Sequence, residues 1–99
     1  MTNSANFLDS ALRAIADPTR RRILIVLKQQ STSPTHRNSG LCAGDIEARI
    51  ALSQPTISHH MAILTKAGLV EAAKQGQWRW YRRNEKMLRR VLKSLRSEL

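Results

Sequence analysis

Residues 52–70 read LSQPTISHHMAILTKAGLV, and this stretch decides the fold of the 99-residue chain. Ser53 is expected to begin a helix and to cap it, with its side-chain oxygen accepting from free N–H groups of the first turn. Pro55 suits that turn, where a missing N–H costs nothing. Three apolar side chains recur at helical spacing and share one face: Ile57, Met61 and Leu64. Gly68 ends the helix, and an extended segment follows.

The other faces of this helix carry polar side chains of modest size: Gln54, Thr56, Ser58, His59 and Lys66. Such a surface forms hydrogen bonds without much bulk and is therefore suited to entering a DNA major groove. We expect Gln54 to pair with adenine, and Thr56, nearer one edge of the helix, to contact phosphate. Exposed polar helix faces are common, so this interpretation depends on the rest of the chain.

Four further helices are expected from apolar side chains at helical spacing, over residues 7–16, 19–30, 43–51 and 85–98. Asp17 and Pro18 separate the first two, because Pro18 disfavours a helical residue before it and suits the start of the next helix. Asn84 is expected to cap the last helix.

The segments between these helices are extended or polar. Two short extended runs, 69–74 and 78–82, flank Gly76, and its freedom to adopt a positive φ predicts a hairpin. Residues 31–40 contain no apolar side chain and are predicted to form a polar loop. Residues 1–6 are predicted to be flexible.

This order of elements is typical of a winged helix-turn-helix: a mainly α fold with about five helices and a small β-hairpin wing. The whole chain, residues 1–99, is predicted to form this single DNA-binding domain. The first and last helices lie outside the helix-turn-helix core and are expected to form a two-fold dimer interface. The residues expected there are Phe7, Leu8, Leu12, Leu88, Val91, Leu92 and Leu95.

The charge of the chain indicates a polyanionic partner. Lys and Arg number 17 against 7 acidic residues, a net charge of +10, which implies nucleic acid or an anionic membrane surface. No apolar run approaches the roughly 20 residues that span a bilayer, and the N-terminus lacks the features of a secretory signal. Cys42 is the single cysteine, so no intramolecular disulfide is possible. We therefore expect a cytoplasmic protein that binds double-stranded DNA and no membrane.

The predicted hairpin adds candidate DNA contacts near its tip: Lys74, Gln77 and Arg79. Alternation along a strand places Trp78 and Trp80 on one face. Arg79 and Tyr81 share the other face. One of these faces must cover the core, so at least one pair is expected to pack there instead of stacking on bases.

Two groups of basic residues have open interpretations. The run from Arg20 to Arg22 lies at a helix start, where the helix dipole disfavours cations, so it either serves another purpose or forms a solvated face. His59 and His60 are adjacent and point about 100° apart on a helix, so they cannot readily chelate one ion. His60 leans toward the apolar side and is expected to be partly buried.

No catalytic set emerges from the sequence, and an enzyme is not expected. The single cysteine has no evident paired base, no glycine-rich phosphate loop is present, and the carboxylates are few and scattered. A different class stays open as an alternative: a sequence-neutral architectural DNA-binding protein, for which the positive charge alone suffices.

Five segments make the chain resemble the ArsR/SmtB-type bacterial repressors: ADPTRRRIL at 16–24, GDI at 44–46, LSQPTISHHMAIL at 52–64, AGLV at 67–70 and GQWRWY at 76–81. They cover nearly the whole chain in the family's order, and the polar loop at 31–39 is the unmatched part. The resemblance implies a homodimeric transcriptional repressor on a palindromic operator, often its own promoter, and hence association with the bacterial nucleoid.

Many members of that family release DNA when they bind a metal or when thiols are oxidised. The arsenic- and cadmium-type site needs Cys-x-Cys, whereas Cys42-Ala43-Gly44 offers one thiol. A second known site uses Asp and His on the last helix, and residues 85–99 contain neither. We therefore expect no metal site and no cofactor. The open alternative is an effector-gated sensor that uses Cys42 for thiol, metal or redox chemistry. A zinc site in such a sensor would combine His36 and Cys42 with ligands from a second subunit.

Overall fold

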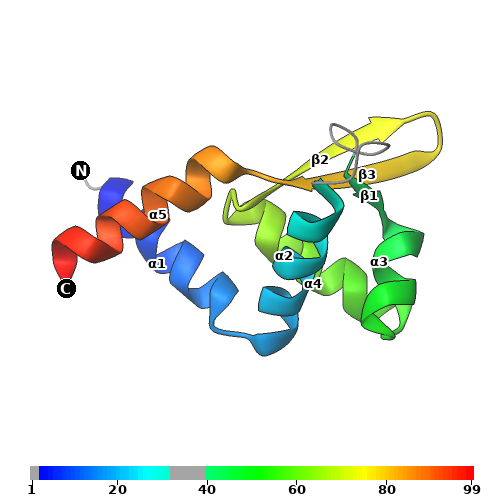
Figure 1. Cartoon of the computed structure of the whole chain (residues 1–99), viewed down its shortest axis with the longest axis horizontal. Helices are drawn as coiled ribbons and strands as arrows, with labels where there is room; N and C mark the ends of the chain where they lie inside the picture. Colours follow the sequence, from blue (N-terminus) through cyan, green and yellow to red (C-terminus); the bar gives the residue numbers. More distant parts are fainter. Residues whose placement is uncertain (1–2, 32–39) are drawn as a thin grey trace.

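The computed structural model describes residues 3–31 and 40–99, and it confirms the winged helix-turn-helix architecture (Figure 1). The elements are α1 (Asn3–Ile15), α2 (Pro18–Ser31), β1 (Leu41–Cys42), α3 (Ala43–Ile50), α4 (Gln54–Lys66), β2 (Val70–Gln75), β3 (Trp78–Arg83) and α5 (Glu85–Glu98). Figure 1 shows α1 and α5 packed together at one end of the molecule and the β2–β3 hairpin extending toward the other. No described helix is long and apolar enough to cross a membrane.

Two helix boundaries differ from those expected. The first helix begins at Asn3 instead of residue 7, so residues 3–6, which were predicted to be flexible, are helical. The second helix extends to Ser31, the first residue of the predicted polar loop. Most of that loop, 32–39, lies outside the described residues.

Gly40 is the last residue of the predicted polar loop and is buried against the sheet. Its φ is +77°, in the left-handed region that favours glycine. A Cβ at this position would collide with the backbone carbonyl of Tyr81 on β3. A glycine is therefore required where the chain enters β1.

One cluster of buried apolar side chains connects all five helices to the sheet. Its members include Leu8, Ile23, Leu27, Leu41, Ile46, Ile57, Leu64, Val70, Tyr81 and Val91. The apolar face predicted for α4 is confirmed, because Ile57, Met61 and Leu64 are each at most 1% exposed. The fourth helix is thus held from one side, and its opposite side is left for solvent.

The predicted hairpin is the larger part of a three-stranded antiparallel sheet with strand order β1-β3-β2. Gln75 is paired with Trp78, so the turn consists of two residues, and Gly76 has a φ of +63° as expected. On β3, Tyr81 is buried and Trp80 is half-buried, which confirms packing for part of the aromatic set. The side chain of Trp78 is outside the described parts of the chain.

Asn84 caps α5 as predicted and also joins α5 to the end of α4. Its Oδ1 accepts from the N–H of Met87 at 3.1 Å, and its Nδ2 donates to the carbonyl of Gly68 at 3.0 Å. The carbonyl of Leu69 accepts from the Asn84 N–H at 2.9 Å. The side chain and the backbone N–H of Asn84 together therefore fix where the α4–β2 connection meets the last helix.

We expect Asn84→Ala to lower the free energy of unfolding by about 1–2 kcal/mol, because the cap and the bond to Gly68 are both lost. Asn84→Asp should lose less, because its carboxylate still accepts from Met87 while the bond to Gly68 disappears. Urea unfolding of the three proteins measures both losses. Equal losses in the two variants would show that the cap contributes nothing.

Candidate nucleic-acid interface

The third and fourth helices meet through a tight turn at residues 51–53. Ala51 closes α3 in the left-handed conformation, with φ +63°, and its N–H donates to the carbonyl of Glu47 at 2.8 Å. The first backbone bond of α4 runs from the Ile57 N–H to the carbonyl of Ser53. This turn places α4 across α3 in the arrangement of a helix-turn-helix.

Ser53 occupies the N-cap position of α4, but the prediction that its side chain caps the helix is wrong. Its Oγ makes no bond to a backbone N–H and lies 3.0 Å from Oγ1 of Thr56. Pro55 explains part of the difference, because it has no N–H in the first turn for a cap to satisfy. The hydroxyl therefore pairs with another side chain.

The outward side of α4 is polar and narrow. Its exposed residues are Gln54, Pro55, Ser58, His59, Ala62 and Lys66. Ser58 and Ala62 are one helical turn apart and are both small, so nothing bulky stands at the middle of this surface. Helix residues with short side chains allow close approach to base edges in a major groove.

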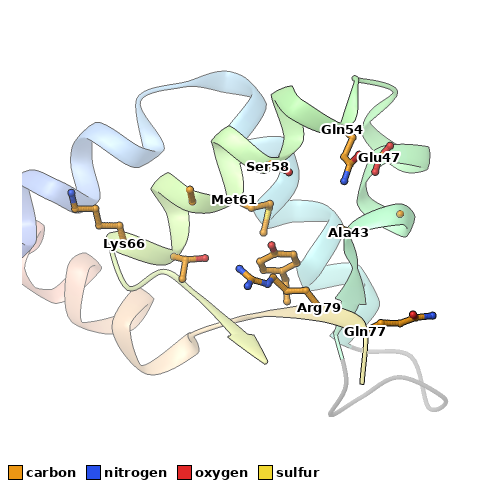
Figure 2. A pocket seen from close by; sticks show the side chains of 12 residues that line it. Ala43, Glu47, Gln54, Ser58, Met61, Lys66, Gln77 and Arg79 are labelled. Carbon is orange, nitrogen blue, oxygen red and sulfur yellow. The ribbon is translucent and has the colours of Figure 1, made fainter. Parts of the chain in front are cut away.

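A groove of about 750 Å³ runs between α3, α4 and β3 (Figure 2). Five of the eight predicted DNA contacts line it: Gln54, Ser58, Lys66, Gln77 and Arg79. Figure 2 shows the Arg79 side chain on β3 across from Ser58 and Met61 on α4. The fold therefore brings the polar face of the helix and the cation of the wing to one concave surface.

Three predicted contacts lie outside the lining of this groove. Thr56 is half-buried and bonded to Ser53, while His59 is exposed on the next stripe of α4. Lys74 is exposed on β2, directly opposite Arg79 in the hairpin register. His59 and Lys74 flank the groove and extend the polar surface beyond it.

The groove also contains residues that the sequence did not single out. They are Ala43, Gly44, Glu47, Met61, Ala62, Thr65 and Tyr81. Glu47 is an acidic side chain on a surface otherwise bordered by Lys66 and Arg79. The helical spacing of Ile46 and Ile50 already implied that Glu47 stands beside their buried face, but its proximity to α4 depends on how the two helices pack.

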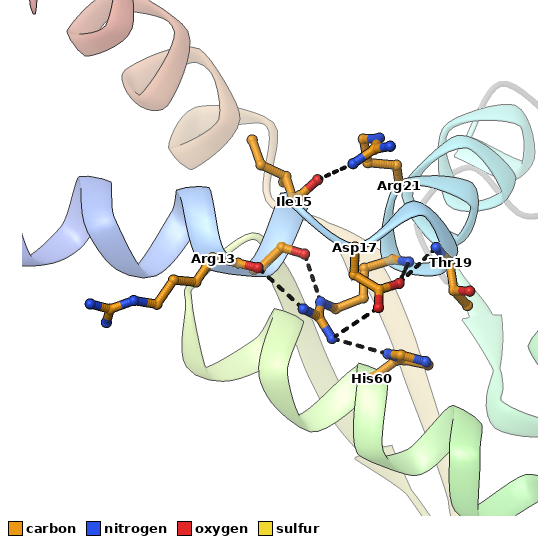
Figure 3. Close-up of polar contacts among 8 residues, drawn as sticks. Arg13, Ile15, Asp17, Thr19, Arg21 and His60 are labelled. Atoms are coloured by element: carbon orange, nitrogen blue, oxygen red, sulfur yellow. Dashed lines mark hydrogen bonds and ion pairs between the residues drawn. The ribbon is translucent and has the colours of Figure 1, made fainter.

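Two members of the basic run at the start of α2 bind the end of α1 (Figure 3). Arg20 and Arg21 donate to backbone carbonyls in the last turn of α1, including Ala14 and Ile15, both at 2.6 Å. These carbonyls have no partner within their own helix. Arg20 and Arg21 therefore stabilise the end of a neighbouring helix, which is the first of the two interpretations of the run. Arg22 is exposed, as the second interpretation expects.

Cys42 is half-buried at the N-cap of α3, and its Sγ donates to Oδ2 of Asp45 at 3.1 Å. Across residues 3–31 and 40–99, no three His, Cys, Asp or Glu side chains are grouped so as to hold a metal ion. His36 lies outside the described residues. Cys42 precedes Ala43, which lines the groove. Its thiol has the single carboxylate of Asp45 as its neighbour in this hydrogen bond.

The residues predicted for the dimer interface fall into three groups. Leu8 and Val91 are buried within a single chain, where α1 packs on α5. The half-buried ones are Phe7, Leu88 and Leu95. Leu12 is 36% exposed and Leu92 is 64% exposed. Of the seven, the last two expose the largest fraction of their apolar surface to a second molecule.

Comparison with known proteins agrees with this geometry. A family model described as a helix-turn-helix domain matches residues 15–72, more than half of the chain. The transcriptional repressor SdpR of Bacillus subtilis is 36% identical over 81 residues, which cover 82% of this chain and 80% of that protein. The family-model match at residues 15–72 includes α2, α3 and α4, and therefore both helices that border the groove.

Two solved structures have the same fold. An ArsR-like transcriptional regulator from Rhodococcus superposes with a TM-score of 0.78 at 27% identity, covering 97% of this chain and 82% of that one. The homodimeric winged helix-turn-helix DNA-binding domain of a Mycobacterium bovis protein gives a TM-score of 0.66 at 23% identity, covering 99% and 88%. This chain belongs to the ArsR family of winged helix-turn-helix transcriptional regulators.

Proposed function

We propose that this regulator is a repressor that binds, as a homodimer, to an inverted repeat in double-stranded DNA and so blocks transcription. One observation carries the proposal: the exposed polar face of α4 and the Arg79 cation of the wing line the same groove. In cells such a protein is associated with the nucleoid while it is bound.

In this proposal α4 reads bases in the major groove. Gln54 has the paired donor and acceptor that match the edge of adenine. Ser58 and His59 provide hydrogen-bonding groups one turn further along, and Ala62 leaves room for the helix to approach. Thr56, already bonded to Ser53, is assigned to a phosphate beside the helix.

The wing and the end of α4 supply the contacts to the backbone of DNA. Arg79 and Lys74 are exposed and are paired in the register of the hairpin, close to Gln77 in its turn. Lys66 is at the last turn of α4, at the far end of the same groove. These side chains fix the position of the domain on the duplex without reading its sequence.

Dimerisation through α1 and α5 supplies the second reading helix. Leu12 and Leu92 are the exposed apolar side chains on those two helices, and the similar domain from Mycobacterium bovis is homodimeric. A two-fold dimer of this kind reads two half-sites about one DNA turn apart, and for that reason we assign an inverted repeat.

A substitution at a base-reading residue and one at a phosphate-binding residue should have different effects on specific and non-specific DNA binding. Ser58→Ala should reduce affinity for the operator about tenfold, because one base contact is worth about 1–3 kcal/mol, and should leave affinity for random DNA almost unchanged. Arg79→Gln should weaken both similarly and reduce the slope of log affinity against log salt by about one unit. Fluorescence anisotropy titrations at several salt concentrations measure these quantities. Equal losses on operator and random DNA for Ser58→Ala would contradict base reading by α4.

A further inference from the structure

Arg20 lies where α1, α2 and α4 meet, and one set of its hydrogen bonds caps the end of α1 (Figure 3). Its Nε donates to the carbonyl of Ala14 at 2.6 Å, and its Nη2 donates to the carbonyl of Arg13 at 3.1 Å. Both carbonyls belong to the last turn of α1, whose backbone oxygens need partners from elsewhere. Arg20 therefore links the start of α2 to the end of α1.

The same guanidinium also reaches α4. Its Nη1 lies 3.2 Å from Nδ1 of His60 and 3.9 Å from the carboxylate of Asp17. Because a guanidinium only donates, Nδ1 of His60 must be the unprotonated acceptor in this bond. The Arg20 side chain is 13% exposed, and His60 is 9% exposed, so water competes little for the contact.

Asp17 holds Arg20 in this position from the turn between α1 and α2. Its Oδ1 accepts from the backbone N–H of Thr19 at 2.7 Å and of Arg20 at 3.2 Å, which caps α2. The first turn of α2 is thus fixed where its arginine can reach two other helices.

The place of His60 on α4 gives this contact its importance. His60 is on the buried side of the helix, directly after the exposed Ser58 and His59 in sequence. A bond on the buried side sets how far the helix is rotated and tilted, and therefore where its exposed side points. The partner at the other end of the link, α1, belongs to the surface proposed for dimerisation.

We propose that Arg20 is a positioning residue that fixes α4 relative to α1, and thereby sets the two reading helices of the dimer in register with the two half-sites of the operator. The inference rests on the proposed function, because it requires a dimer whose α4 helices read DNA. It adds a specificity-determining side chain that does not touch DNA.

The link depends on the protonation state of His60. Burial lowers the pKa of His60; the Asp17 carboxylate raises it, the Arg20 and His59 cations lower it, and the net pKa is below its ordinary value of 6.5. Among the described residues these are the charged groups that act on the ring, and they come from the α1–α2 turn, from α2 and from α4 itself. The ring is therefore neutral and accepts at neutral pH. Protonation of the ring in the folded protein removes the acceptor and so breaks the bond to Arg20. The stabilisation that this bond provides is complete above pH 6.5 and is lost as the pH falls from 6.5 toward the lowered pKa of His60.

The test measures the specificity ratio, defined as affinity for an operator fragment recovered from genomic DNA divided by affinity for a random duplex of equal length. His60→Leu removes the acceptor, and Arg20→Gln removes the guanidinium. Each should lower the ratio about tenfold while the dimer persists in light scattering. Arg21→Gln is the matched control, because Arg21 bonds the carbonyl of Ile15 in the same turn of α1 and has no bond to α4 among the described residues. Its ratio should equal that of the wild type.

His60→Asn separates a positioning role from a structural one. The asparagine Oδ1 can accept from Arg20 near the place of Nδ1 and does not titrate. Its ratio should match the wild type at about pH 7.5 and stay constant as the pH is lowered, whereas the wild-type ratio falls once the pH passes below the lowered pKa of His60. His59 is present in both the wild type and His60→Asn, so the difference between their ratios reports on position 60 alone.

Two results would overturn the inference while leaving the proposed function intact. One is a wild-type ratio in both His60→Leu and Arg20→Gln. The other is a His60→Asn ratio that falls with pH as steeply as the wild type. A wild-type ratio of one on every fragment would contradict the proposed function itself, and the inference with it.

Discussion

Ser58→Glu is expected to abolish operator binding, with a loss of at least about 100-fold at physiological salt. Ser58 is exposed and lines the groove between α3, α4 and β3, so the new side chain does not disturb the core. When DNA fills the groove, the carboxylate would be desolvated beside phosphates with no partner, and an unpaired charge of this kind costs several kcal/mol. A loss of 100-fold corresponds to about 2.7 kcal/mol. Anisotropy titration with the operator measures it.

Ser97→Glu provides the matched control for this experiment. Ser97 is also exposed, lies in the last turn of α5 and is far along the chain from the groove. The two variants have the same net charge, so they share any general loss of attraction for DNA. We expect a small loss of operator affinity for Ser97→Glu. Similar losses in the two variants would assign binding to charge alone, as in a sequence-neutral architectural protein.

Leu92→Glu is expected to produce a monomer and to reduce operator affinity about 100-fold. Leu92 is 64% exposed on α5, and in the proposed dimer two copies of this helix meet. A carboxylate in each copy would bring two like charges into an apolar interface. Without the dimer, the two half-sites are no longer bound together, and linked binding typically contributes a factor of 10² or more. Light scattering measures the mass, and anisotropy measures the affinity.

Ile25→Glu is the control for Leu92→Glu. Ile25 is 53% exposed on α2, so it is an apolar side chain of similar exposure on a helix outside the proposed interface. This variant should remain dimeric and retain most of its operator affinity. A dimeric Leu92→Glu protein with normal operator binding would place the interface elsewhere on the chain.

The positions of the helices and of the hairpin could be predicted because each has a local cause. Apolar residues at helical spacing define α4 through Ile57, Met61 and Leu64, and the positive φ of Gly76 defines the turn of the wing. The start of α1 was placed too late, because the residues before Phe7 carry no apolar pattern to mark it. Local signals are thus sufficient where a stripe or a special φ exists.

Side-chain partners were less predictable, because each depends on competition among several groups. Ser53 has the chemistry of a cap, but the nearby Thr56 hydroxyl takes its oxygen. Asp17 separates α1 from α2 as predicted, and its carboxylate also caps α2, a role that was not predicted from the sequence. The bond from Arg20 to His60 joins residues 40 positions apart, a separation that no local pattern reports.

The candidate site shows the same division. Helical periodicity was enough to put Gln54 and Ser58 on the exposed side of α4, and hairpin geometry was enough to put Arg79 near the wing. Their convergence on one groove depends on packing of α3 against α4, which also brings in Glu47. The dimer interface stays a prediction, although burial of Leu8 and Val91 within one chain narrows it to the side chains that remain accessible.

The most direct test of sequence-specific binding is to incubate the purified protein with sheared genomic DNA at physiological salt and to sequence the fragments that it retains. We expect enrichment of a short inverted repeat whose half-sites are about one helical turn, or roughly 10 base pairs, apart. Enrichment upstream of its own gene would also identify an autoregulated operator. Uniform retention of all fragments would contradict base reading by α4 and leave the positive charge as the basis of binding.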